Sequence, residues 1–201
     1  MSETPPTRQQ ALELLKEFNR TDRALKHALA VEAVMRHMAI KAGGDVQKWG
    51  IVGLIHDLDF EMFPEQHCTK TRQILAERGW PEEVIRAAVA HGWGTCSNTD
   101  PQSLLEKTLY AIDELTGLVS AVALVRPSRS LEDLEARSVR KKWKDLRFAA
   151  GVDRGVIEKG AEMLGVELSQ LITDVIEGMK PVASELGFAS QAGPLPGTEP
   201  G

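Results

Sequence analysis

The sequence predicts an all-α protein, and three observations support this fold class. Apolar residues recur at helical spacing in nearly every segment of the chain. No segment alternates polar and apolar residues over the length of a strand, and no Asn-Gly pair marks a hairpin. Glycine or proline stands at nearly every break between the periodic segments. A sheet between about Thr21 and Val125 would contradict this prediction.

The first helix is expected at about 7–18, and a second helix follows it. The second begins after Thr21 or Asp22, because either side chain can accept a hydrogen bond from a free amide of the first turn. It ends at the Gly43-Gly44 stop signal. One face of this helix is apolar, and His27 lies within that face.

The third helix begins near Asp45 and delivers His56 and Asp57 at its C-terminal end. Its second half, GIVGLI, is apolar on all sides, which is typical of a helix in the core. The following stretch, DFEMFPEQ, is expected to form a loop, since Pro64 breaks a helix.

Three further helices are expected in the middle of the chain. The fourth runs from about His67 to Arg78, and the fifth has Pro81 in its first turn and His91 in its last turn. A short turn joins them, so we expect an antiparallel hairpin that brings the two histidines together. The sixth, from about Pro101 to Val125, carries Asp113.

The C-terminal part follows Pro127 with the basic stretch RSVRKKWKDLR and two helices, at about 153–164 and 167–187. We therefore divide the chain into an N-terminal helix (1–20), a core (21–126), a C-terminal helical extension (127–187) and a tail (188–201). The tail, which contains QAGPLPGTEPG, has no apolar periodicity and is predicted to be disordered.

Composition narrows the class of protein. The chain has 201 residues and a formal net charge of −5, which argues against a dedicated nucleic-acid binder but allows a small phosphorylated ligand. No stretch is expected to cross a bilayer, and the N-terminus does not resemble a signal peptide. Cys68 and Cys96 are expected to be reduced, small buried or half-buried residues of a cytoplasmic protein. The sequence does not indicate the oligomeric state.

Four of the five histidines fall on apolar helix faces or at helix ends. Each has a structural explanation when taken alone: His27 as a core histidine, His67 as a surface residue, and His91 as a helix-end residue favoured by the dipole. Asp57 could close its helix, and Asp113 could be half exposed. The adjacent His56-Asp57 pair is harder to explain in this way, because an unpaired carboxylate beside the core costs several kcal/mol. A metal ion removes that cost, and imidazole with carboxylate is a typical ligand set.

The ordered set His27, His56-Asp57, His67, His91 and Asp113 resembles the HD superfamily of metal-dependent phosphohydrolases. The segments KHALAVEAVMRHMA, WGIVGLIHDLDFE, AVAHGWG and RSVRKKWKDLRFAAGVDRGVIEKGAEMLG are similar to bacterial HDIG-type or HD domain-containing hydrolases. The resemblance covers about 21–187, and it implies an HD-domain helical bundle with additional C-terminal helices.

The resemblance also implies the site. His27, His56, Asp57 and Asp113 match the ligands of the primary divalent metal ion. His67 and His91 match the extra histidines of the dinuclear subclass, in which Asp57 bridges both ions. One or two ions per chain are implied, of Mn, Fe, Mg, Co, Ni or Zn.

One departure from the family pattern concerns phosphate binding. HDIG members have a lysine after His-Asp-Ile-Gly, whereas this chain continues Leu58-Asp59-Phe60. Phosphate would then need other cations, and the candidates are Lys70, Arg72, Arg126, Arg129, Arg137, Arg140, Lys141 and Lys142. A solvated helix face is the alternative explanation for the cluster at 137–142. Asp59 and Glu61 are candidates for a proton shuttle, or simply helix-end and loop carboxylates.

The function implied is hydrolysis of a phosphate ester or anhydride, in a nucleotide, by water whose pKa the metal lowers to roughly 7. Two alternatives remain open. The domain could bind metal and nucleotide without turnover, as a sensor. The same six ligands would also serve a dinuclear-iron oxygenase of this superfamily.

Overall fold

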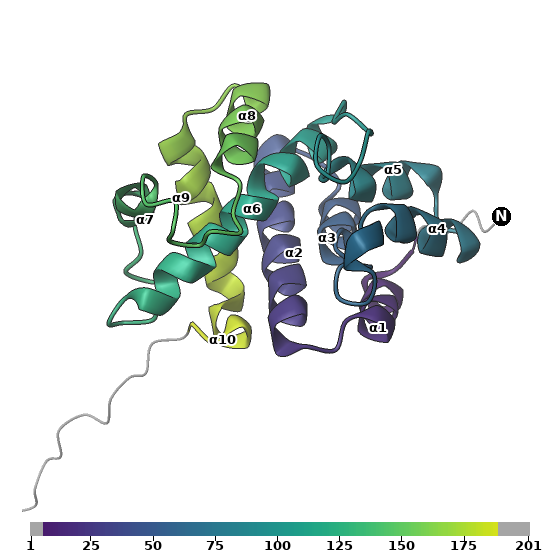
Figure 1. Cartoon of the computed structure of the whole chain (residues 1–201), viewed down its shortest axis with the longest axis horizontal. Helices are drawn as coiled ribbons and strands as arrows, with labels where there is room; N and C mark the ends of the chain where they lie inside the picture. Colours follow the sequence, from purple (N-terminus) through teal and green to yellow (C-terminus); the bar gives the residue numbers. More distant parts are fainter. Residues whose placement is uncertain (1–5, 189–201) are drawn as a thin grey trace, which may run out of the picture.

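The computed structural model describes residues 6–188, and these residues form helices and no strand (Figure 1). The one β-type contact among them is an isolated bridge between Trp93 and Ser97. The predicted all-α fold is therefore confirmed for the described part of the chain.

The N-terminal half contains five α-helices and a short 3₁₀ turn. Their bounds are α1 (Arg8–Phe18), α2 (Asp22–Ala42), α3 (Val46–Ile55), η1 (Pro64–Gln66), α4 (Thr69–Glu77) and α5 (Glu82–Ala90). The predicted start and stop of α2 are confirmed, because Thr21 accepts a hydrogen bond from the Ala24 amide and Gly43 adopts a left-handed conformation. The predicted start of α4 was wrong: the helix begins at Thr69, and His67 lies in the loop before it.

The close packing of α2 against α3 brings His27 towards His56. All of residues 49–55 of α3 are buried, as expected for a segment that is apolar on every side. Gly53 lies against the backbone of α2, where a Cβ would stand 3.0 Å from the Val31 carbonyl oxygen. A larger residue at this position would push the two helices apart and would misplace the residues at the end of α3.

The helix α6 (Leu104–Val125) runs through the centre of the molecule and contacts α2, α5, α8 and α9 (Figure 1). A capping box of Ser103 with Glu106 fixes its start. The expectation that no stretch could cross a bilayer needs correction, because α6 is long and apolar enough by length and composition alone. Most of that stretch is buried within the protein, and the helix carries Asp113 into the site, which identifies it as a core helix.

The C-terminal part adds α7 (Ala136–Lys142), α8 (Arg154–Leu164), α9 (Leu168–Met179), η2 (Lys180–Val182) and α10 (Ala183–Leu186). The single helix predicted over 167–187 is interrupted, because Pro181 cannot donate a backbone hydrogen bond and a 3₁₀ turn forms around it. Phe188, which was assigned to the tail, is buried in the core at 5 % exposure. The rest of the predicted tail, 189–201, lies outside the described residues.

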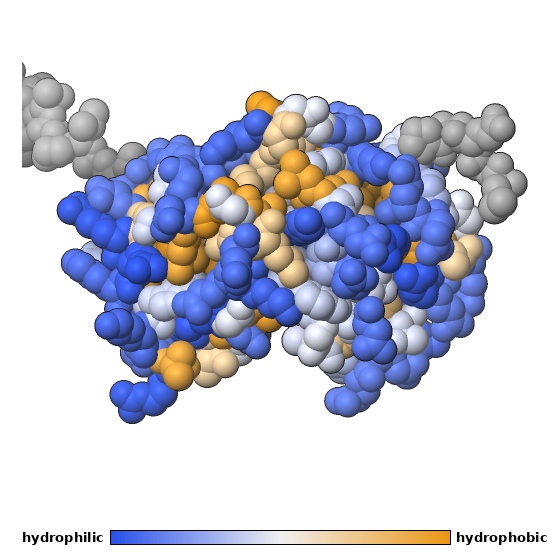
Figure 2. All heavy atoms as spheres, turned by 90° about the horizontal axis from the view of Figure 1, so that it is seen from above, coloured by the Kyte–Doolittle hydropathy of each residue, from blue (hydrophilic) through white to orange (hydrophobic). Residues whose placement is uncertain are grey.

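The face seen from above is mostly hydrophilic, and a band of apolar residues interrupts it (Figure 2). Exposed large apolar side chains are scattered over several elements, which is ordinary for a folded protein. They are Ile40, Phe60, Met62, Leu104, Leu124, Val125, Leu146 and Val166.

Candidate metal centre

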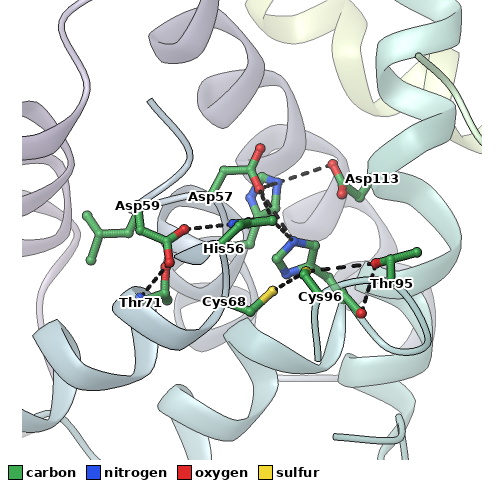
Figure 3. Close-up of polar contacts among 12 residues, drawn as sticks. His56, Asp57, Asp59, Cys68, Thr71, Thr95, Cys96 and Asp113 are labelled. Atoms are coloured by element: carbon green, nitrogen blue, oxygen red, sulfur yellow. Dashed lines mark hydrogen bonds and ion pairs between the residues drawn. The ribbon is translucent and has the colours of Figure 1, made fainter. Parts of the chain in front are cut away.

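Six side chains from five separate places in the chain converge on one cluster. His27 comes from α2, His56 and Asp57 from the end of α3, and Asp113 from α6. His67 comes from the loop before α4, and His91 caps the C-terminal end of α5. Figure 3 shows His56, Asp57 and Asp113 turned towards one another between these elements. The structure thus brings together all six predicted metal ligands.

Asp113 joins the two histidines at the α2–α3 side of the cluster. Its Oδ1 lies 2.9 Å from Nε2 of His27 and 3.1 Å from Nε2 of His56. His56 is fully buried, and the Asp113 side chain is 17 % exposed. One carboxylate oxygen therefore faces two imidazole nitrogens in a mostly buried position.

Asp57 lies between the two halves of the cluster. Its Oδ1 is 3.4 Å from Nε2 of both His67 and His91, and 3.5 Å from Nε2 of His56. Its Oδ2 points the other way, 3.6 Å from Nε2 of His27. The two oxygens of Asp57 thus face different histidines, as the oxygens of a bridging carboxylate do.

His67 and His91 form the second half of the cluster. Their Nε2 atoms are 3.2 Å apart, although the residues are carried by the two ends of the α4–α5 hairpin. The helices α4 and α5 are in contact, which confirms the predicted hairpin.

Hydrogen bonds outside the cluster fix the orientation of three imidazoles. Nδ1 of His56 lies 2.8 Å from the Gly53 carbonyl oxygen, and Nδ1 of His91 lies 2.6 Å from that of Ala88. Nδ1 of His67 lies 2.7 Å from Oδ1 of Asp59. Each of these oxygens can only accept, so each Nδ1 carries a hydrogen and donates it. In the neutral imidazoles, Nε2 is then a bare lone pair that points into the cluster.

This arrangement fits a bound cation. Bare Nε2 lone pairs would face carboxylate oxygens and one another, and these acceptor–acceptor contacts are repulsive unless a cation or protons lie between them. Donation from Nδ1 to a carbonyl or carboxylate is also the usual outer arrangement around a metal-bound histidine. The family's divalent metal therefore suits the residues present.

The pKa values of the residues in the cluster also indicate that positive charge is favoured at this site. Burial opposes charging of His67, but its hydrogen bond with Asp59 raises the pKa of this imidazole to about 10. Burial likewise opposes charging of His91, whereas the contact with Asp57 raises its pKa to about 9. Despite the opposing effect of burial, the neighbouring His56 holds the pKa values of Asp57 and Asp113 well below their usual range. Without a metal, protons would occupy the site.

Asp59 does not have the geometry predicted for a proton shuttle. Its side chain is fully buried, one oxygen accepts from Nδ1 of His67, and the other accepts from the Thr71 amide at 2.7 Å (Figure 3). With both oxygens engaged, Asp59 orients His67 and anchors the start of α4. It is a positioning residue.

Glu61 also has a structural partner. It accepts hydrogen bonds from the Thr21 amide (3.0 Å), the Thr21 hydroxyl (2.8 Å) and the Arg20 amide (3.1 Å). These hydrogen bonds lower the pKa of Glu61, and those from Thr21 have the largest effect. The carboxylate therefore ties the loop after α3 to the start of α2, and the prediction of a proton shuttle finds no support in its position.

The predicted phosphate-binding cations are divided between two parts of the molecule. Lys70 and Arg72 lie on α4, which begins two residues after His67, but each has another partner: Gln73 at 2.9 Å and Glu82 at 2.9 Å. Arg137 and Lys141 lie on α7, at the opposite end of the long axis from α4 and α5 (Figure 1). The structure therefore does not bring these two residues to the cluster.

The remaining basic candidates also lie in the C-terminal part. Arg126 pairs with Asp133, and Arg140 and Lys142 are on α7 with Arg137. The position of Arg140 and Lys142 on α7 agrees with the alternative explanation of a solvated helix face for the cluster at 137–142. The missing lysine of the HDIG motif is therefore not replaced by this group.

Sequence reasoning missed two features near the site. Glu114, next to Asp113 on α6, is partly buried, and this burial with the nearby Asp113 charge raises its pKa to about 7. Cys68 and Cys96, which are far apart in the chain, meet beside His67 and His91. Only the tertiary structure shows this meeting, because 28 residues separate them.

Comparison with known proteins identifies the family. Neither the search of curated proteins nor the search of solved structures gave a match. The family model described as HD domain matches residues 24–118, which include all six converging side chains. The fold and the match agree: residues 24–118 of this chain form an HD domain, and the members of this domain family bind divalent metals.

Proposed function

We propose that this protein is a metal-dependent phosphohydrolase that acts on a phosphate ester or anhydride, with a nucleotide as the substrate class and the cytoplasm as its location. The observation that carries the proposal is the position of Asp57, whose two oxygens face different histidines on opposite sides. A carboxylate placed in this way can serve two ions.

The proposed primary ion is held by His27, His56, Asp57 and Asp113, and the proposed second ion by His67, His91 and Asp57. Two overlapping groups of donor atoms lie close enough together to hold an ion. One contains His56, Asp57, His91 and Asp113, and the other contains His67, Cys68 and His91. The chemistry that divalent ions supply when bound is activation of water and polarisation of phosphoryl oxygens.

The residues of the chain then have separate tasks. Asp57 and Asp113 provide the negative charge that binds cations, and the three Nδ1 donors hold the imidazoles in one orientation. The partial exposure of His27 and Asp57, at 27 % and 22 % of their side chains, leaves one side of the cluster open to a substrate. Glu114 follows Asp113 on α6, and its burial together with the Asp113 charge raises its pKa to about 7 in the metal-free protein.

The test is a substrate screen with metal-replete protein. The protein is stripped with a chelator, reloaded anaerobically with Mn²⁺ or Fe²⁺, and incubated with aryl phosphates, nucleoside phosphates and cyclic nucleotides while phosphate or nucleoside is measured. Turnover that the Asp57→Ala variant lacks would support the proposal. Binding of nucleotide without turnover would favour a sensor module, and oxygen consumption by the iron form would favour an oxygenase. Either result would replace the proposal.

A further inference from the structure

The two cysteines of the chain meet at the edge of the metal centre. The Sγ atoms of Cys68 and Cys96 are 2.6 Å apart. This is closer than two unbonded sulfur atoms normally approach, and roughly 0.5 Å longer than a disulfide bond of about 2.05 Å. Both residues are free thiols in the structure. In Figure 3 the Cys68 side chain points towards Cys96.

The backbone conformation at Cys68 directs the side chains of His67 and Cys68 towards different partners. Cys68 has a φ of 66°, a value that costs free energy for a residue with a side chain. This conformation leaves His67 turned towards Asp57 and Asp59 while Cys68, only 3 % exposed, faces Cys96. A strained backbone that creates this contact is held in place by the surrounding structure.

Cys96 lies in a compact loop that follows His91. The Gly92 carbonyl oxygen accepts from the amides of Thr95, Cys96 and Ser97, each within 2.9–3.0 Å, and from the Thr95 hydroxyl at 2.9 Å. Cys96 therefore needs no large movement to reach Cys68.

Gly92 makes room for both sulfur atoms. A Cβ at this position would lie 2.5 Å from Sγ of Cys68 and closer still to Sγ of Cys96. The two sulfurs are therefore packed against the same stretch of backbone, directly after His91. The pair connects the loop that carries His67 with the loop that follows His91.

We propose that Cys68 and Cys96 form a reversible dithiol–disulfide pair, with a hydroperoxide as the oxidant. Cys96 is half-buried and Cys68 is buried, so Cys96 is the sulfur that the oxidant reaches. Its thiolate attacks one peroxide oxygen, the O–O bond breaks, and an alcohol or water leaves. The thiolate of Cys68 then attacks Sγ of the sulfenic acid and releases water. Two thiols thus lose two electrons, and the peroxide gains them.

The oxidised pair has a consequence for the neighbouring site. Sγ of Cys68 lies within 4.8 Å of a ring nitrogen of His67 and of His91, so a reduced pair could also offer a thiolate to a metal ion. A disulfide removes both thiolates from this role and links the two loops. The experiment must therefore separate disulfide formation from metal ligation.

The test uses the full-length, metal-free protein. After reduction and removal of the reductant, the protein is treated with hydrogen peroxide at about one equivalent, denatured, alkylated with iodoacetamide and analysed by mass spectrometry. The chain has two cysteines, so an intramolecular disulfide has one assignment. We expect the mass of the monomer to fall by two hydrogens, with no alkylation and a peptide linking Cys68 to Cys96. Dithiothreitol should restore two alkylated sites.

The single variants Cys68→Ser and Cys96→Ser are the matched controls, and circular dichroism checks that each is folded. Each should lose the intramolecular link, and Cys68→Ser should accumulate sulfenic acid at Cys96, trapped by dimedone. The proposal is overturned if the oxidised wild type keeps two alkylatable thiols or forms only links between chains. It is also overturned if the thiols resist alkylation only in protein to which metal has been added, and the chain does not lose two hydrogens.

Discussion

Asp59 accepts a hydrogen bond from Nδ1 of His67 at 2.7 Å, and this contact directs Nε2 of His67 at Asp57, 3.4 Å away. A fully buried carboxylate thus controls a histidine of the metal centre without lying inside it. The same carboxylate holds the Thr71 amide at the start of α4. The second half of the centre therefore depends on an outer residue as well as on its own donors.

The variant Asp59→Asn tests this dependence. The two oxygens of Asp59 accept from different donors, and the amide group replaces one of them with an NH2 group, which would face either Nδ1–H of His67 or the Thr71 amide as a second donor. We expect affinity for the second metal equivalent to fall about 10–100-fold, while the first equivalent is retained. Metal titration monitored by calorimetry provides the measurement. The control is Glu61→Gln, which alters the Thr21 contact and should leave both affinities unchanged; equal behaviour of the two variants would contradict the role of Asp59.

Asp57→Ala should abolish both metal binding and hydrolysis. Both halves of the cluster lose a donor, so the cost should exceed that of removing either His67 or His91 alone. Metal content after dialysis and turnover of the best substrate in the screen are the readouts. The surface variant Asp22→Asn, whose side chain is 81 % exposed, serves as the control. Full metal content in Asp57→Ala would remove the basis of the assignment.

The double variant His67→Ala, His91→Ala tests the number of ions. We expect two metal equivalents per wild-type chain after anaerobic loading with Mn²⁺ or Fe²⁺, and one in the double variant, which should lose most of its activity. Elemental analysis gives the count. If wild type and the double variant both bind one equivalent, the centre is mononuclear and these histidines belong to the substrate pocket.

Metal affinity should increase with pH. In the metal-free protein the pKa values of His67 and His91 are raised to about 10 and 9, so protons compete with metal for this pair of imidazoles at pH 7. Metal must displace these protons, and binding should strengthen from pH 6 to about pH 9. Because the folded pKa values exceed the ordinary value of 6.5, these protons stabilise the metal-free fold below that pH. This stabilisation is lost as pH rises through 9 to 10.

Calorimetry in buffers of different ionisation enthalpy measures the number of protons released. The double variant His67→Ala, His91→Ala should release fewer protons than wild type. Metal binding that does not change with pH would show that the two imidazoles are already neutral.

Truncation after Phe188 should leave fold and activity nearly unchanged, because the removed sequence is rich in glycine and proline and has no apolar face. In contrast, Phe188→Ala should destabilise the protein by about 3 kcal/mol, since the ring is buried in the core. Thermal unfolding of both variants compares the two effects. A large fall in melting temperature on truncation alone would show that residues 189–201 contribute to stability.

The sequence alone determined the helical class and much of the metal centre. Local signals act within a few residues, so Thr21 and Gly43 correctly marked the ends of α2. The apolar GIVGLI segment likewise placed His56 and Asp57 at the end of a core helix. The resemblance to a family then supplied the order of the six ligands.

Tertiary structure alone decided which partner each polar group finds. Asp59 and Glu61 look alike in the sequence as loop carboxylates, yet one is buried against His67 and the other holds the start of α2. The meeting of Cys68 with Cys96 depends on the α4–α5 hairpin and on the absence of a side chain at Gly92. Periodicity reports which face of an element is buried, but contacts between distant segments depend on how the elements pack, and no local pattern records that packing.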